Sequence, residues 1–162
     1  MKKLNIALVA HDARKQELMN WCKFNSGMLS FHNLYATGTT SKLLSEIDVP
    51  IREHYSDGFI DTTKKLEVVS LLSGPLGGDQ QIGAMIAEGK IDVLIFFCDN
   101  LITQGHQQDV GALSRLASLY NIAFASNRTT ADMILTSTLL DDPNYVRQIP
   151  TAIEAYKNRM NK

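Results

Sequence analysis

Several classes of protein are excluded by what this sequence lacks. No apolar run approaches the roughly 20 residues of a membrane-spanning helix, and the run at residues 4–10 is short and interrupted by Asn5. No small-residue cleavage site follows that run, so we expect no secretory signal peptide. The 16 Lys and Arg residues nearly balance the 17 Asp and Glu residues, which gives no overall attraction to nucleic acid or to an anionic membrane. Any anion-binding site must therefore be local.

Cysteine is scarce, and the common nucleotide-binding motifs are missing. Cys22 and Cys98 have no metal-binding spacing and lie in apolar sequence, which indicates buried free thiols in a reducing compartment. The sequence has neither the Gly-Lys-Ser/Thr ending of a Walker loop nor a Gly-x-Gly-x-x-Gly fingerprint. Sites for nucleoside triphosphates and dinucleotides therefore lose support.

What the chain does have is a regular alternation of apolar runs and helical patterns. Its 162 residues suffice for one core but not for two ordinary domains, so we expect a single domain over residues 1–162. We predict an α/β fold with a doubly wound, Rossmann-like or flavodoxin-like, mainly parallel sheet of about five strands and helices on both faces. The runs expected to form the strands are residues 4–10, 31–37, 66–72, 91–97 and 122–126.

The alternation fails between Asp48 and Lys65. A proline near the start of this segment and a Ser-Asp-Gly turn in its middle indicate an inserted excursion, either a hairpin or an ordered loop. Elsewhere we expect helices to begin at good capping residues, namely Asp12, Thr39 or Thr40, and Asp109.

A glycine-rich turn, Ser73-Gly74-Pro75-Leu76-Gly77-Gly78-Asp79, follows the third predicted strand. Such a turn lets backbone amides approach an anion, and this one carries a carboxylate at its end. Alone it is a weak signal, but other polar residues also follow strand ends, where open α/β sheets bind ligands. The full set on this edge is His11, Asp12, Lys15, Thr37, Thr39, Thr40, Ser73, Gly74, Asp79, Asp99 and His106.

The residue types in this set narrow the chemistry. Hydroxyls, glycine-turn amides and one lysine form a cradle for a single phosphate group. Neighbouring carboxylates repel one another, which raises the pKa of at least one of them and favours a role in proton transfer. Proton abstraction next to a carbonyl is the reaction that fits best. Each residue alone also has a simpler explanation, as a helix cap, a loop histidine or a surface charge. Metal binding by His and Asp is possible, although the histidines lack close pairing.

Several blocks of this sequence resemble the methylglyoxal synthase family. They are Ile6-Ala7-Leu8-Val9-Ala10-His11-Asp12, Tyr35-Ala36-Thr37-Gly38-Thr39-Thr40, Ser73 to Ala84 with its Gly-Gly-Asp-Gln-Gln core, and Glu88 to Phe97. The resemblance implies a cytoplasmic lyase, without metal or organic cofactor, that converts dihydroxyacetone phosphate into methylglyoxal and inorganic phosphate through an enediolate. It also implies a homohexamer and allosteric inhibition by inorganic phosphate.

The resemblance further implies a role for each site residue. Asp79 corresponds to the general base that takes the C3 proton, and His106 to the group that polarises the carbonyl. Asp109, Asp99 and His11 correspond to supporting acid–base and orienting groups. The implied phosphate-binding residues are Lys15, Thr37, Thr39, Thr40, Ser73 and Gly74, joined by Arg159 from a neighbouring subunit.

Two features depart from the family pattern, and two other functions stay open. Residues 48–65 lengthen the chain between Thr40 and Ser73, and the loop around His106 has Asn100, Gly105 and Gln108 where the family usually has prolines. Gln107 also replaces an aspartate after that histidine. The same fold serves as a non-catalytic, phosphate-binding or phosphorylated-metabolite-binding regulatory module in carbamoyl phosphate synthetase. A phosphosugar isomerase would use a similar enediolate.

Overall fold

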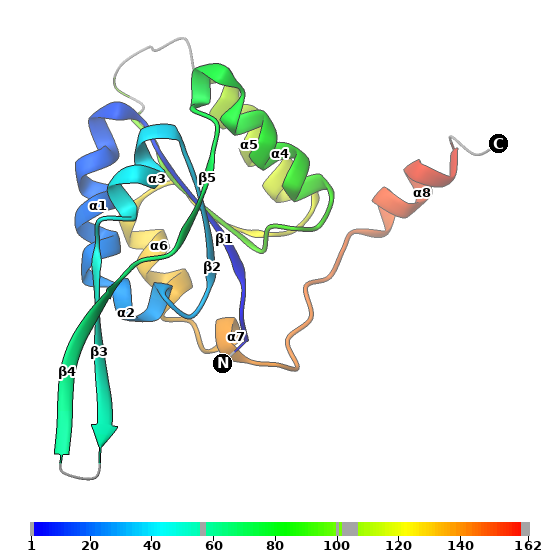
Figure 1. Cartoon of the computed structure of the whole chain (residues 1–162). Coiled ribbons are helices and arrows are strands. Elements are labelled where there is room, and N and C mark those ends of the chain that lie inside the picture. The colour runs from blue at the N-terminus through cyan, green and yellow to red at the C-terminus, as the bar shows by residue number, and fades with distance from the viewer. Residues whose placement is uncertain (1, 56–57, 100, 102–106, 160–162) are drawn as a thin grey trace.

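A five-stranded parallel sheet forms the centre of the molecule in the computed structural model, which describes residues 2–55, 58–99, 101 and 107–159 (Figure 1). Its strand order is β5-β2-β1-β6-β7, and all four pairings are parallel. The strands are β1 (Asn5–Ala10), β2 (Asn33–Thr37), β5 (Val68–Leu71), β6 (Val93–Phe97) and β7 (Ala123–Ala125). Each lies within a run predicted from the sequence, so the fold class is confirmed.

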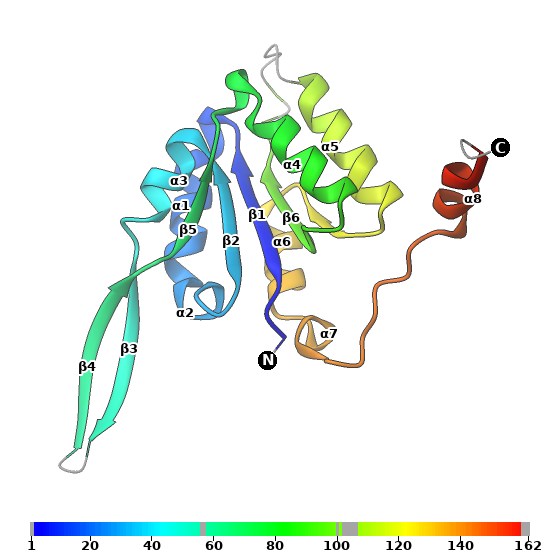
Figure 2. The same cartoon turned by 45° about the vertical axis from the view of Figure 1, so that its right-hand side comes forward.

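Helices cover both faces of this sheet because its strands are apolar on both sides (Figure 2). Leu8 of β1 points into the core beneath α1 (Lys15–Phe24), α2 (Ser26–Leu29), α3 (Gly38–Leu44) and α6 (Arg128–Leu135). Its neighbours Ala7 and Val9 point into a second core beneath α4 (Gly78–Ala87) and α5 (Gln107–Leu119). Trp21 is fully buried in the first core, where its indole Nε1 donates a hydrogen bond to Asp132 Oδ1 at 2.6 Å.

The predicted caps are wrong in detail. Asp12 opens a short 3-10 turn (Asp12–Arg14) and makes an ion pair with Lys15, so it does not cap α1. α3 begins at Gly38, which places Thr39 and Thr40 inside its first turn, and α5 begins two residues before Asp109. The reason is that Thr37 and Gly38 already turn the chain into α3, which leaves the following hydroxyls available for other contacts.

The excursion at residues 48–65 is a hairpin. β3 (Asp48–Tyr55) and β4 (Gly58–Lys65) pair antiparallel in a separate two-stranded sheet that projects from the body (Figures 1 and 2). Its base is anchored in the core because Val49 and Leu66 are each only 2% exposed.

The C-terminal segment also leaves the body. After the short α7 (Thr138–Asp141), the chain runs without regular structure to α8 (Thr151–Arg159), which lies apart from the sheet in both views (Figures 1 and 2). Within the described ranges, no helix has the length and apolar character needed to cross a membrane.

Candidate active site

A cavity of about 140 Å³ opens at the carboxyl edge of the sheet, where the sequence predicted the site. It is lined by Val9, Ala10, His11, Asp12, Lys15, Thr37, Thr39, Thr40, Ser73, Gly74, Pro75, Asp79 and Phe96. Nine of these are residues expected on this edge from the sequence. The loops that follow β1, β2 and β5 therefore converge on one space.

Two glycines allow the loops to come this close. Gly38 has a φ of +42°, and a Cβ there would lie 2.7 Å from Ser73 Cβ. Gly78 packs against the backbone, since a Cβ there would lie 1.9 Å from the carbonyl oxygen of Leu72. Gln81 Oε1 also accepts a hydrogen bond from the Leu72 amide at 2.8 Å, which ties α4 to the end of β5. The threonine loop and the glycine turn are therefore held side by side.

The predicted phosphate cradle has a cation and hydroxyls in place. Lys15 Nζ donates to Thr39 Oγ1 at 2.8 Å and lies 2.5 Å from Asp12 Oδ1, so the ammonium group is fixed beside the threonine loop. Thr40 is 2% exposed, and its hydroxyl has no hydrogen-bond partner among the described residues. A buried hydroxyl of this kind is stabilised when a ligand oxygen pairs with it.

Asp79 brings a buried carboxylate to the same cavity. It stands in the first turn of α4 and is 7% exposed. The positive end of the helix dipole stabilises negative charge at this position. Because the cradle and the carboxylate belong to one cavity, phosphate binding and proton transfer can take place on one small molecule.

His11 is held in a defined orientation. Its Nδ1 accepts a hydrogen bond from the Asp99 amide at 2.8 Å, so in the neutral ring the proton lies on Nε2. The ring packs edge-on against Phe96 with centroids 5.1 Å apart. Nε2 is buried and has no hydrogen-bond partner within the described part of the chain. His11 therefore presents an N–H donor for an oxygen of a ligand.

Of the remaining predicted residues, Asp99 and Arg159 are described and do not line this cavity. Asp99 does not line the cavity; its backbone orients His11 while its Oδ1 accepts from the Leu101 amide at 3.0 Å. His106 lies outside the described residues, and for Asp109 only the backbone position in the first turn of α5 is described. Arg159 is exposed on α8, away from the cavity of its own chain.

Gln81 and Phe96 are not among the site residues predicted from the sequence. Phe96 lines the cavity and supports the His11 ring, and Gln81 fixes the Leu72 backbone. Gln81 stands in the Gly-Gly-Asp-Gln-Gln block, which was the available signal. Phe96 lies in the apolar run 91–97, and nothing in that run indicated a residue of the site.

The two cysteines are free and buried, as predicted. Burial raises the pKa of the Cys98 thiol to about 11 and raises the pKa of Cys22 still further. Both are therefore protonated near neutral pH, and neither supplies a thiolate nucleophile beside the cavity. Across the described ranges, no group of three or more His, Cys, Asp or Glu side chains is arranged to hold a metal ion.

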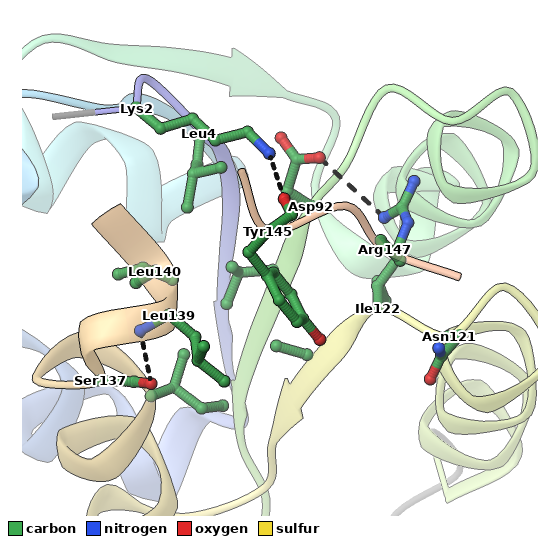
Figure 3. Close-up of a pocket in the computed structure, with 13 residues that line it drawn as sticks. Lys2, Leu4, Asp92, Asn121, Ile122, Ser137, Leu139, Leu140, Tyr145 and Arg147 are labelled. Carbon is green, nitrogen blue, oxygen red and sulfur yellow. Dashed lines mark hydrogen bonds and ion pairs between the residues drawn. The ribbon is translucent and has the colours of Figure 1, made fainter. Parts of the chain in front are cut away.

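A second cavity, of about 290 Å³, lies at the opposite edge of the sheet (Figure 3). Its charged groups already have partners in the fold. Arg147 Nη1 donates to the Ile91 carbonyl at 3.0 Å and lies 4.0 Å from Asp92, whose Oδ2 accepts from the Asn5 amide at 2.9 Å. Lys2 Nζ donates to the Tyr145 carbonyl at 3.3 Å. None of the predicted site residues is here, so the smaller cavity is the candidate active site.

Comparison with known proteins identifies the family of this chain. Residues 17–126 match the family model described as the MGS-like domain. The methylglyoxal synthase of Leptospira interrogans serogroup Icterohaemorrhagiae serovar copenhageni (strain Fiocruz L1-130) is 45% identical, over 97% of this chain and 92% of its own length. That of Proteus mirabilis (strain HI4320) is 49% identical, over 88% of this chain and 84% of its own.

A solved structure shows the same relationship. The crystal structure of methylglyoxal synthase from Elizabethkingia anophelis NUHP1 is 41% identical, with a TM-score of 0.78 over 96% of this chain and 91% of that one. The match spans both the sheet and the site loops of this protein. The chain belongs to the methylglyoxal synthase family.

Proposed function

We infer that this protein is a lyase that converts dihydroxyacetone phosphate into methylglyoxal and inorganic phosphate. The observation that carries the inference is the joint presence of a buried carboxylate, Asp79, and a lysine–threonine cradle in one cavity of about 140 Å³. The relatives named methylglyoxal synthase, at 45% and 49% identity over most of the chain, support the same activity.

The first chemical step follows from the placement of Asp79. With the substrate phosphate held by Lys15, Thr39, Thr40 and the amides after Ser73, the Asp79 carboxylate takes a proton from the hydroxymethyl carbon. The electron pair of that C–H bond forms the enediolate double bond, and negative charge develops on the carbonyl oxygen. His11 Nε2–H is the described donor that can stabilise this charge.

The second step separates a lyase from an isomerase. The enediolate expels phosphate when the C–O bond to the phosphate stands perpendicular to the enediolate plane, because the electron pair then overlaps that bond. The phosphate leaves with the bonding electrons, and the resulting enol rearranges to methylglyoxal. A cradle that fixes the phosphate out of plane selects this outcome, and orientation of this kind supplies up to several kcal/mol of barrier reduction.

On the resemblance, we further assign carbonyl polarisation to His106 and a supporting acid–base role to Asp109 and Asp99. We assign phosphate binding also to Thr37, Ser73 and Gly74, which line the cavity. A purely regulatory phosphate-binding module has no need of a buried carboxylate beside its ligand. Asp79 therefore favours the enzyme over the non-catalytic alternative.

The finer features of the family are also proposed for this chain: one domain with an inserted hairpin, a cytoplasmic location, a homohexamer and inhibition by inorganic phosphate. The C-terminal segment supports association, because Val146 and Tyr156 are 71% and 67% exposed. α8 projects from the body with Arg159 near its end, which suits an arginine that completes the phosphate site of a neighbour.

A product assay tests the activity. Purified protein supplied with dihydroxyacetone phosphate should release equal amounts of methylglyoxal and phosphate, and Asp79→Asn should lose nearly all of this activity while remaining folded. Glyceraldehyde phosphate as the product would indicate an isomerase instead. Tight phosphate binding in calorimetry with no product of either kind would establish the regulatory module and refute the lyase.

A further inference from the structure

The second cavity, at the amino edge of the sheet, is about twice the size of the active-site cavity. Its volume is about 290 Å³, against about 140 Å³. Its walls come from the chain entering β1, β6 and β7, from α6 and α7, and from the segment that follows α7. Because an apolar cavity of about 150 Å³ can hold benzene, this one can hold a ligand with an apolar body of about six to ten carbon atoms.

Most of the side chains that line this cavity are apolar. Leu4, Val93 and Ile122 belong to the two cores and form its inner wall. Leu139 and Tyr145 stand at the rim, where they are 50% and 48% exposed, and the Tyr145 ring points into the cavity (Figure 3). A ligand with an apolar body would remove this surface from water, which is the main driving force for binding in pockets of this kind.

The charged groups at the rim leave one positive charge without a carboxylate partner. Asp92 is engaged through both oxygens, since Oδ1 lies 4.0 Å from Arg147 Nη1 and Oδ2 accepts from the Asn5 amide at 2.9 Å. Lys2 Nζ donates to the Tyr145 carbonyl at 3.3 Å, which is a neutral acceptor (Figure 3). Among the described residues, no ion pair includes Lys2. Two cations and one carboxylate therefore give the lining a net charge of +1.

We propose that this cavity is a second ligand-binding site, which takes a small carboxylic acid with an apolar body, either a short aliphatic chain or a single aromatic ring. The body packs against the apolar walls, and the carboxylate stays at the rim beside Lys2 and Arg147. Both cations carry more N–H donors than their contacts within the chain use. The net positive charge of the lining favours an acid over an amine of the same size.

This site is separate from the active-site cavity. β1 runs from one to the other, and its length from Asn5 to Ala10 is about 17 Å at about 3.3 Å per residue. None of the described residues lines both cavities. Binding here therefore does not depend on the proposed lyase activity, and a phosphate ion in the Lys15 cradle does not block it.

A matched set of ligands tests the chemistry. In NMR titrations of the whole chain, hexanoate should bind about tenfold more tightly than hexylamine, which has the opposite charge, and than acetate, which lacks the apolar body. The amide signals that shift should include those of Val93, Ile122 and Ala123, and saturating inorganic phosphate should not change the affinity. Equal binding of hexanoate and hexylamine, shifts confined to the active-site cavity around Thr39, or no binding of hexanoate would overturn the proposal.

Substitutions test whether the acid binds in this cavity. Lys2→Met removes the charge and should weaken hexanoate binding about fivefold, and Leu139→Asp places a carboxylate in the apolar wall and should abolish it. Lys3→Met and Met133→Asp make the same changes at residues that do not line the cavity, and both should bind as the wild type does. All four positions are exposed, so each variant should fold, which a thermal melt checks. Wild-type affinity in both cavity variants, or an equal loss in the controls, would refute the site.

Discussion

Replacing Gly78 with alanine should disable the active site without removing any catalytic group. The new Cβ would lie 1.9 Å from the Leu72 carbonyl oxygen, whereas Cβ contacts below 3.0 Å are essentially never observed. The two segments must therefore separate by at least about 1.1 Å. Both neighbours on that side are backbone atoms of Leu72, so the start of α4 has to move.

That movement carries Asp79, the next residue, away from the substrate. A misplacement of about 1 Å can lower the rate of a positioned reaction about 100-fold, so we expect kcat of Gly78→Ala to fall by that order. Overpacking of this kind also costs about 1–3 kcal/mol of stability. At this chain length, each kcal/mol lowers Tm by roughly 2–4 °C.

The assay is methylglyoxal formation at saturating dihydroxyacetone phosphate, together with a thermal melt. Gly111→Ala is the matched control, because nothing lies within 4 Å of its Cβ position and alanine favours the helix there. It should keep full activity and lose no stability. A folded Gly78→Ala protein with wild-type kcat would refute the argument that close approach of α4 to Leu72 positions the carboxylate.

Three further predictions concern named hydrogen bonds and one thiol. His11→Phe should lower kcat about 10²–10³-fold with a smaller effect on KM in steady-state assays, because it removes a donor aimed at the developing oxyanion; equal activity would exclude that role. Trp21→Phe should cost about 1–3 kcal/mol in urea unfolding, since it removes the indole hydrogen bond to Asp132 and leaves part of a fully buried site unfilled, and an unchanged midpoint would contradict this. Burial raises the pKa of Cys98 from 9.0 to about 11, so its thiolate fraction at pH 8 is about 100-fold lower than in the unfolded chain. Alkylation should therefore be slow at pH 8 and should accelerate as pH rises toward 11 or on unfolding in urea; rapid labelling of the folded protein at pH 8 would contradict this.

Local sequence determined the fold class of this protein and the edge on which its site lies. Apolar runs such as residues 91–97 are typical of strands in a parallel sheet that helices cover on both faces. The alternation of strands and helices could therefore be predicted from the sequence alone. Because parallel strands end on the same edge, polar residues after Ala10, Thr37 and Leu72 had to gather there. The sequence also marked residues 48–65 as an insertion, although its mixed pattern did not decide between hairpin and loop.

Tertiary structure decided how the site is assembled, because the deciding contacts join residues far apart in the chain. Gly38 meets Ser73 through a close approach that no local pattern encodes. The His11 tautomer is set by the Asp99 amide, 88 residues away. Asp99 therefore orients His11 through its backbone amide, whereas the residue type alone had suggested that its carboxylate would act in the site. Sequence therefore identified most of the residues in the cavity, and packing between loops set what each of them presents to a ligand.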